Sequence, residues 1–101
     1  AQMVAERIAF VAHYKQVLCI THLPQIACMA DEHLYIAKSV KGDTTITQVT
    51  ALSDEERVRE IARMASGDDV TEAALANARE MLAGAGKKKA AFQTKKKAAK
   101  K

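Results

Sequence analysis

The feature that most restricts the fold of this chain is a short apolar run at residues 17–20. The run reads Val-Leu-Cys-Ile, is continuously apolar and contains β-branched side chains. This pattern is typical of a strand that is buried on both faces of a parallel sheet. No second run of this kind occurs in the 101 residues. We therefore expect an α/β fold with an incomplete sheet, most of whose strands are missing from this chain.

A turn with a histidine follows this run directly, at residues 21–24. Pro24 biases Leu23 away from helical backbone angles and suits the first turn of a short helix over residues 24–30. His22 is then expected at the carboxyl end of a buried strand, where ligands bind in open α/β sheets. A hydrogen bond from the imidazole that only fixes the turn is the alternative. Both interpretations of His22 stay open from placement alone.

The rest of the apolar pattern predicts one helix before this unit and a β-hairpin after it. Residues 1–14 carry apolar side chains at helical spacing. Residues 33–38 and 44–51 have the alternation and the β-branched content of strands, and a Lys-Gly-Asp turn separates them. The expected inward face of the first helix is Val4, Ile8 and Val11.

Two further helices are predicted after the hairpin. Ser53 and Glu56 form a capping box for the first of them, and Gly67 ends it. Asp69 or Thr71 caps the second, which Gly84 is expected to end. The expected apolar faces are Val58, Ile61, Ala62 and Ala65, and then Ala74, Leu75, Ala78, Met81 and Leu82. Six charged residues of the first of these helices are expected to lie mostly on a solvated face; they are Glu55, Glu56, Arg57, Arg59, Glu60 and Arg63.

Charge divides the chain into two parts. Residues 1–83 carry eight basic and twelve acidic side chains, a net charge of −4, whereas residues 84–101 carry eight lysines and no acid. The second part has too little apolar surface to offset the entropy of ordering it, so we expect a disordered lysine-rich tail. A solvated tail, non-specific and salt-dependent polyanion binding, or an origin in cloning would each explain it.

The one metal-like constellation is formed by Cys19, His22, Cys28 and His33. Both cysteines lie in apolar surroundings, where a reduced cysteine serves as a small hydrophobe. We therefore expect no zinc site, no disulfide framework and a reducing, cytoplasmic setting. No apolar run approaches the roughly 20 residues that a bilayer requires, and no secretory signal is visible, so no membrane contact is expected.

The run over residues 17–27 resembles the switch-histidine segment of ABC-type ATPases. It is more closely similar to the C-terminal end of the RecN family of bacterial DNA repair proteins, which are ATPases related to the SMC proteins. The resemblance covers about residues 1–83, and the lysine tail lies outside it. The other residues that carry it are Ala1, Gln2, Val4 to Glu6, Asp31, His33, Lys38, Thr45, Thr47, Val49, Glu56 to Val58, Glu60 to Met64, Gly67, Thr71, Ala73 to Leu75, Ala78 and Glu80 to Leu82.

The resemblance implies that residues 1–83 are the C-terminal portion of a P-loop ABC/SMC-type ATPase head. The division into residues 1–83 and a tail over residues 84–101 comes from the charge pattern. In such proteins the N-terminal half of the chain completes the head, and two heads form a homodimer around ATP. ATP hydrolysis serves the recombinational repair of DNA double-strand breaks. The expected location is the cytoplasm, in association with the nucleoid. His22 matches the switch histidine, which contacts the γ-phosphate and helps to hold the attacking water. Gln25 is a further candidate for contact with the nucleotide. It is also expected to support the turn that carries His22.

The motifs that bind the nucleotide are missing from this chain. It has no phosphate-binding G-x-x-x-x-G-K-[ST] loop, no apolar strand that ends in Asp-Glu, and no signature motif. ATP and Mg²⁺ are thus expected in the complete parent protein and not on this chain alone, which is expected to be inactive. Two alternatives remain: a small nucleic-acid-binding module that acts through its tail, and a structural interaction domain with an exposed sheet edge.

Overall fold

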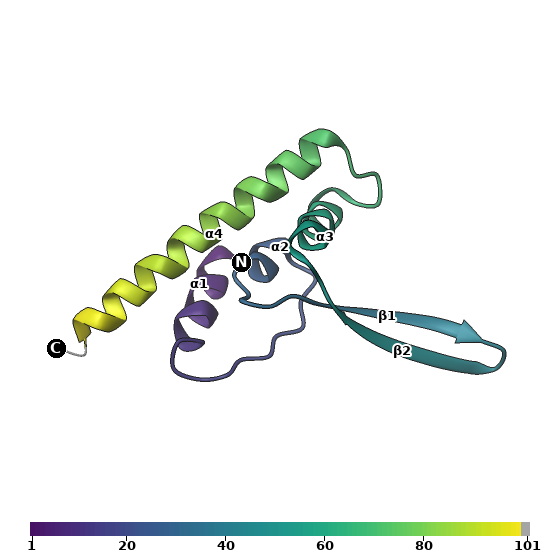
Figure 1. The fold of residues 1–101 in the computed structure, drawn as a ribbon, viewed down its shortest axis with the longest axis horizontal. Helices are drawn as coiled ribbons and strands as arrows, with labels where there is room; N and C mark the ends of the chain where they lie inside the picture. Colours follow the sequence, from purple (N-terminus) through teal and green to yellow (C-terminus); the bar gives the residue numbers. More distant parts are fainter. Residues whose placement is uncertain (100–101) are drawn as a thin grey trace.

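The computed structural model describes residues 1–99, with side chains described through residue 92. Four helices and one hairpin follow in the order α1, α2, β1, β2, α3 and α4. Helices α1, α2 and α3 pack against one side of the long α4, and the hairpin projects away from them (Figure 1). The elements are α1 (Gln2–Val11), α2 (Pro24–Cys28), β1 (Leu34–Lys41), β2 (Thr44–Ala51), α3 (Asp54–Ser66) and α4 (Glu72–Ala99).

The expected strand at residues 17–20 does not form, so this part of the prediction is wrong for this chain. Leu18 is 85% exposed and Ile20 is 91% exposed. Within residues 1–99 the sheet consists of β1 and β2 alone, paired antiparallel from Leu34 opposite Ala51 to Lys41 opposite Thr44. A strand has no hydrogen bonds of its own and requires a neighbouring strand as partner. The α/β class is confirmed, and the parallel sheet of an ATPase head is not part of this structure.

The hairpin and the capping box are confirmed. Gly42 adopts a φ of +62° in the turn, a conformation that favours glycine. The amide of Glu56 donates to Ser53 Oγ at 3.3 Å, and the amide of Ser53 donates to Glu56 Oε1 at 3.0 Å. Helix α3 then ends at Gly67, whose φ is +86°. These elements form as predicted because their signals lie within a few neighbouring residues.

The core is small and lies where α1, α2 and α3 meet α4. Ile61 is its largest fully buried side chain, with none of its surface exposed. Helix α1 packs through Ala5 and Ala9, whereas Val4 and Val11 of its expected face are exposed. On α3, Ala65 is also exposed instead of buried. The other buried core residues are Ala27, Cys28, Met29, Val58, Ala62, Ala78 and Ala85.

Helix α4 continues through Gly84 to Ala99, which corrects the prediction that it ends at Gly84 and that a disordered tail follows. Each glycine inside a helix costs about 1 kcal/mol relative to alanine. Packing offsets this cost, because Ala85 is buried and Lys88 Nζ lies 2.9 Å from Glu6 Oε1 of α1. Residues 100–101 of the predicted tail lie outside the described residues. A domain boundary at residue 83 stays a prediction.

The chain exposes more surface than a self-contained domain of its mass. Its accessible surface is 7545 Å², against about 5,600 Å² for a folded monomer of this size. Its radius of gyration is 15.7 Å, against about 13 Å for a compact domain of this length. The excess reflects the projecting hairpin and the long α4. None of the helices in the described part of the chain is both long enough and apolar enough to cross a membrane.

Candidate functional site

His22 lies on the turn between the extended segment at residues 17–20 and α2, and its side chain is exposed. The hydroxyl of Thr21 accepts a hydrogen bond from the amide of Leu23 at 3.0 Å, and this bond closes the turn. Pro24 then occupies the first turn of α2, after Leu23 in an extended conformation. The turn is therefore built by its neighbours and does not use the imidazole of His22. The role of His22 at a nucleotide stays a prediction.

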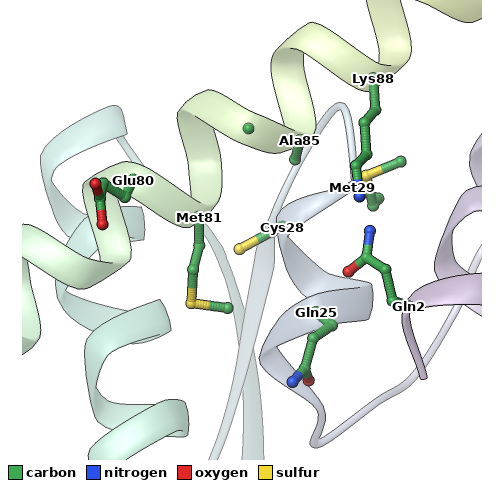
Figure 2. A pocket seen from close by; sticks show the side chains of 9 residues that line it. Gln2, Gln25, Cys28, Met29, Glu80, Met81, Ala85 and Lys88 are labelled. Carbon is green, nitrogen blue, oxygen red and sulfur yellow. The ribbon is translucent and has the colours of Figure 1, made fainter.

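Gln25 lines a cavity of about 210 Å³ between α2 and α4 (Figure 2). Cys28 of α2 and Lys88 of α4 line the same cavity, together with Gln2 of α1. His22 is not among the lining residues. The structure thus places Gln25 and His22 near the same end of α2 without bringing them into one pocket. The expected contact of Gln25 with a nucleotide stays a prediction.

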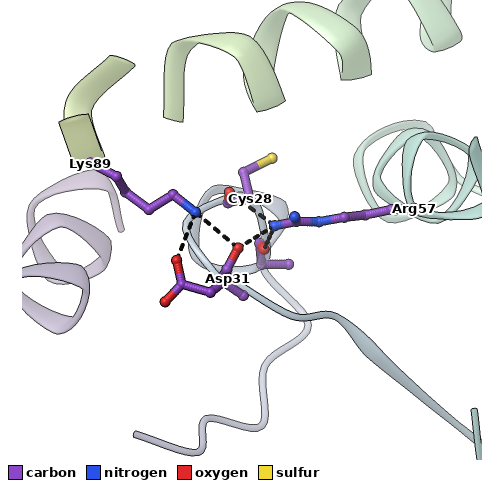
Figure 3. Close-up of polar contacts among 6 residues, drawn as sticks. Cys28, Asp31, Arg57 and Lys89 are labelled. Atoms are coloured by element: carbon purple, nitrogen blue, oxygen red, sulfur yellow. Dashed lines mark hydrogen bonds and ion pairs between the residues drawn. The ribbon is translucent and has the colours of Figure 1, made fainter. Parts of the chain in front are cut away.

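The C-terminal end of α2 is held by two cations from distant parts of the chain (Figure 3). Arg57 Nη2 of α3 donates to the carbonyl oxygens of Ala27 and Cys28, each at 3.1 Å, and of Ala30 at 2.7 Å. Lys89 Nζ of α4 donates to the carbonyl oxygen of Ala30 at 3.2 Å and to Asp31 Oδ1 at 3.1 Å. The prediction that Arg57 belongs to a solvated face is wrong. Its contacts join residues about 30 positions apart, and no local pattern indicates them.

The four residues of the metal-like spacing do not come together. Cys19 is exposed and Cys28 is buried. Burial raises the pKa of the Cys28 thiol, and the nearby charge of Arg57 opposes this shift only in part. The described residues contain no group of three or more His, Cys, Asp or Glu side chains that could hold a metal ion. The Cys28 thiol therefore packs as a small apolar group in the core.

His33 gives the chain a predicted pH dependence. Burial lowers its pKa below the ordinary value of 6.5, and the nearby charge of Arg57 adds to this effect, while Glu60 opposes it. When the pH falls below 6.5, His33 becomes protonated in the unfolded chain but stays neutral in the folded chain until the pH reaches its lower folded-state pKa. The free energy of unfolding should therefore fall as the pH is lowered through about 6.5, the ordinary pKa of histidine, and should keep falling until the pH passes the lower pKa of folded His33. Urea unfolding at a series of pH values measures this change.

His33→Gln is the control for this prediction, since it removes the titrating group. The pKa values of Glu6 and Glu56 are lowered below their ordinary value of 4.5, by Lys88 and by Ser53 respectively. Their contributions to stability are therefore lost only at more acidic pH. An equal loss of stability in the wild type and in His33→Gln would contradict the assignment to His33.

Comparison with known proteins gives one consistent result. No family model matches the chain. DNA repair protein RecN from Bacillus subtilis is 54% identical over 82 residues, which are 81% of this chain and 14% of that protein. RecN from Halalkalibacterium halodurans is 52% identical, again over 81% of this chain and 14% of the relative. RecN from Deinococcus radiodurans is 48% identical over 80% of this chain and 14% of the relative. The chain spans about one seventh of the length of these curated relatives. Over four fifths of its length the chain is thus similar to a segment of RecN proteins, which is consistent with the C-terminal part of such a protein.

Proposed function

We propose that this chain is the C-terminal part of the ATPase head of a RecN-type DNA repair protein, and that it contributes His22 as the switch histidine. The observation that carries the proposal is the exposed imidazole of His22 on a turn that other residues close, in a chain 42–54% identical to segments of RecN proteins. The bond from the amide of Leu23 to the hydroxyl of Thr21 supports the proposal, because it closes the turn and leaves the imidazole of His22 available.

An exposed imidazole at this position suits phosphoryl transfer. One ring nitrogen can donate a hydrogen bond to a phosphate oxygen, while the other can accept one from a water molecule. Positioning and charge stabilisation, rather than covalent chemistry by the protein, dominate this class of reaction. ATP with Mg²⁺ supplies the phosphoanhydride that is broken. The role of His22 is to hold the terminal phosphate and the attacking water in line, and Gln25 supports the same end of α2.

The remaining parts of the proposed site belong to other segments of the parent protein. The described residues hold no cluster of acidic side chains for Mg²⁺, and residues 1–101 contain no phosphate-binding loop. The proposed partners are accordingly the N-terminal half of the head, a second head in an ATP-bridged homodimer, and DNA in the cytoplasm. Apart from Lys88 and Lys89, which pair with Glu6 and Asp31, the lysines of residues 84–101 offer DNA phosphates a non-specific, salt-dependent contact.

Hydrogen exchange on a full-length RecN-type protein that contains this segment tests whether the turn lies at the nucleotide. We expect amides in peptides that cover residues 20–28 to exchange more slowly when Mg²⁺ and a non-hydrolysable ATP analogue are added. Peptides from the hairpin tip around Gly42 serve as the internal control, since the tip projects away from the helices. Slowed exchange elsewhere in the protein, with residues 20–28 unchanged, would contradict the proposed place of His22.

A further inference from the structure

The turn that carries His22 leads into a helix that cannot hold its own orientation. Helix α2 has five residues, and isolated helices shorter than about 12 residues are marginal in water. Its N-cap residue, Leu23, provides no side-chain hydrogen bond to the first turn. In its last turn the carbonyl groups of Ile26 and Ala27 accept bonds from the amides of Met29 and Ala30, just past the helix, and the carbonyl group of Cys28 accepts one from Arg57. The orientation of α2 therefore depends on contacts from other elements.

Core packing of Ala27 and Cys28 supplies part of these contacts, and Arg57 supplies most of the side-chain hydrogen bonds to the carbonyl groups at the C-terminal end of α2. Its Nη2 atom has two N–H groups for three carbonyl oxygens, so at least one N–H is shared between two acceptors. A cation at the C-terminal end of a helix is also favoured by the helix dipole. The side chain of Arg57 is half-buried, which weakens the screening of these interactions by water.

The backbone of Arg57 is itself firmly placed. The capping box of Ser53 and Glu56 determines where α3 begins, and Arg57 is the next residue after that box. Val58, which follows it, is buried in the core. Arg57 thus connects the core face of α3 to the end of α2, and α2 is short enough for a shift at this end to reach His22 at the other.

We propose that Arg57 is a positioning residue, which holds α2 against α3 and thereby places His22 for its role at the nucleotide. This inference rests on the proposed function of His22. Lysine would not replace arginine fully, because an ammonium group is a compact donor on a flexible stem and lacks the planar fork of a guanidinium group. Lys89 assists from α4, but it donates to Ala30 and Asp31 beyond the end of α2 and to no carbonyl within it.

The test is a double-mutant cycle between Arg57 and His22 in a full-length RecN-type protein. Arg57→Met keeps the apolar stem and removes the donors. We expect it to lower kcat about tenfold to a hundredfold, as a displaced catalytic group does, with little change in KM for ATP. Arg57→Lys should recover part of this loss. In the His22→Ala background, Arg57→Met should cause little further loss, because the two residues act as one unit.

Arg59→Met is the matched control, since Arg59 is exposed on the same helix, and we expect it to keep the wild-type rate. Hydrogen exchange gives a second readout that does not depend on activity. Arg57→Met should speed exchange in peptides that cover residues 23–30, and Arg59→Met should not.

The possible failures are distinguishable. Suppose that His22→Ala lowers turnover. The positioning role of Arg57 is overturned if Arg57→Met then lowers kcat by the same factor with and without His22→Ala, or if it leaves both hydrogen exchange and turnover unchanged. The proposed function of His22 stands in either case. If His22→Ala leaves turnover unchanged, both are overturned.

Discussion

Replacement of His22 by alanine in a full-length RecN-type protein is expected to lower kcat for ATP hydrolysis by about 10²–10³-fold, the effect of losing one preorganised hydrogen-bond donor at a developing charge. Affinity for ATP should change little, because residues 1–101 contain no phosphate-binding loop and the proposed site takes that loop from another segment. The fold should also be unaffected, since His22 is exposed and Thr21 closes the turn. Steady-state turnover and equilibrium binding of a fluorescent ATP analogue measure the two quantities separately.

Two variants serve as controls for this experiment. His22→Gln keeps a hydrogen-bond donor at this position and should retain more activity than His22→Ala. Asp43→Ala changes an exposed residue at the hairpin turn and should leave turnover at the wild-type rate. Equal loss of ATP affinity and of turnover in His22→Ala would show that the residue binds nucleotide without a specific part in hydrolysis. A wild-type rate would remove His22 from the site.

Replacement of Ile61 by alanine is expected to have the largest effect on stability. Ile61 has none of its surface exposed and is the largest fully buried side chain in the core. An Ile→Ala change at such a position costs about 2–5 kcal/mol through lost burial and the cavity that remains. That is a large part of the roughly 5–15 kcal/mol that separates folded from unfolded small domains. Urea unfolding of this chain, followed by circular dichroism, measures the change.

Val40→Ala is the matched control, because Val40 is 72% exposed on the hairpin. Substitutions at exposed positions change stability by about 0.5 kcal/mol or less. A similar loss in both variants would mean that the core around Ile61 does not carry the stability of the chain. A loss confined to Ile61→Ala would locate that stability where the helices meet α4.

Local signals predicted much of the fold. The hairpin, the capping box of Ser53 and Glu56, and the end of α3 at Gly67 are all confirmed, because each depends on residues that are close in sequence. The cap of α4 is of the same kind: the amide of Ala74 donates to Thr71 Oγ1 at 3.1 Å. The turn that presents His22 also follows from its own residues, through Thr21 and Pro24.

Three features could not be predicted in this way. The first is that residues 17–20 do not form a strand, because the described residues provide no neighbouring strand to pair with them. The course of α4 past Gly84 depends on the burial of Ala85 and on the ion pair between Lys88 and Glu6. The contacts of Arg57 with α2 connect residues about 30 positions apart in the sequence, and no helical or strand periodicity extends over that distance.

The sequence by itself determined which segments form the helices and the hairpin, with the exception of the end of α4, and it placed His22 on a turn before a helix. Caps, turns and periodic faces are decided by interactions over a few residues, so they can be derived from the order of the side chains. Only the tertiary structure decided which face of α1 is buried, how far α4 extends, and that Arg57 and Lys89 hold the end of α2. These outcomes depend on which surfaces meet in space, because burial and ion pairing between distant residues outweigh local preferences.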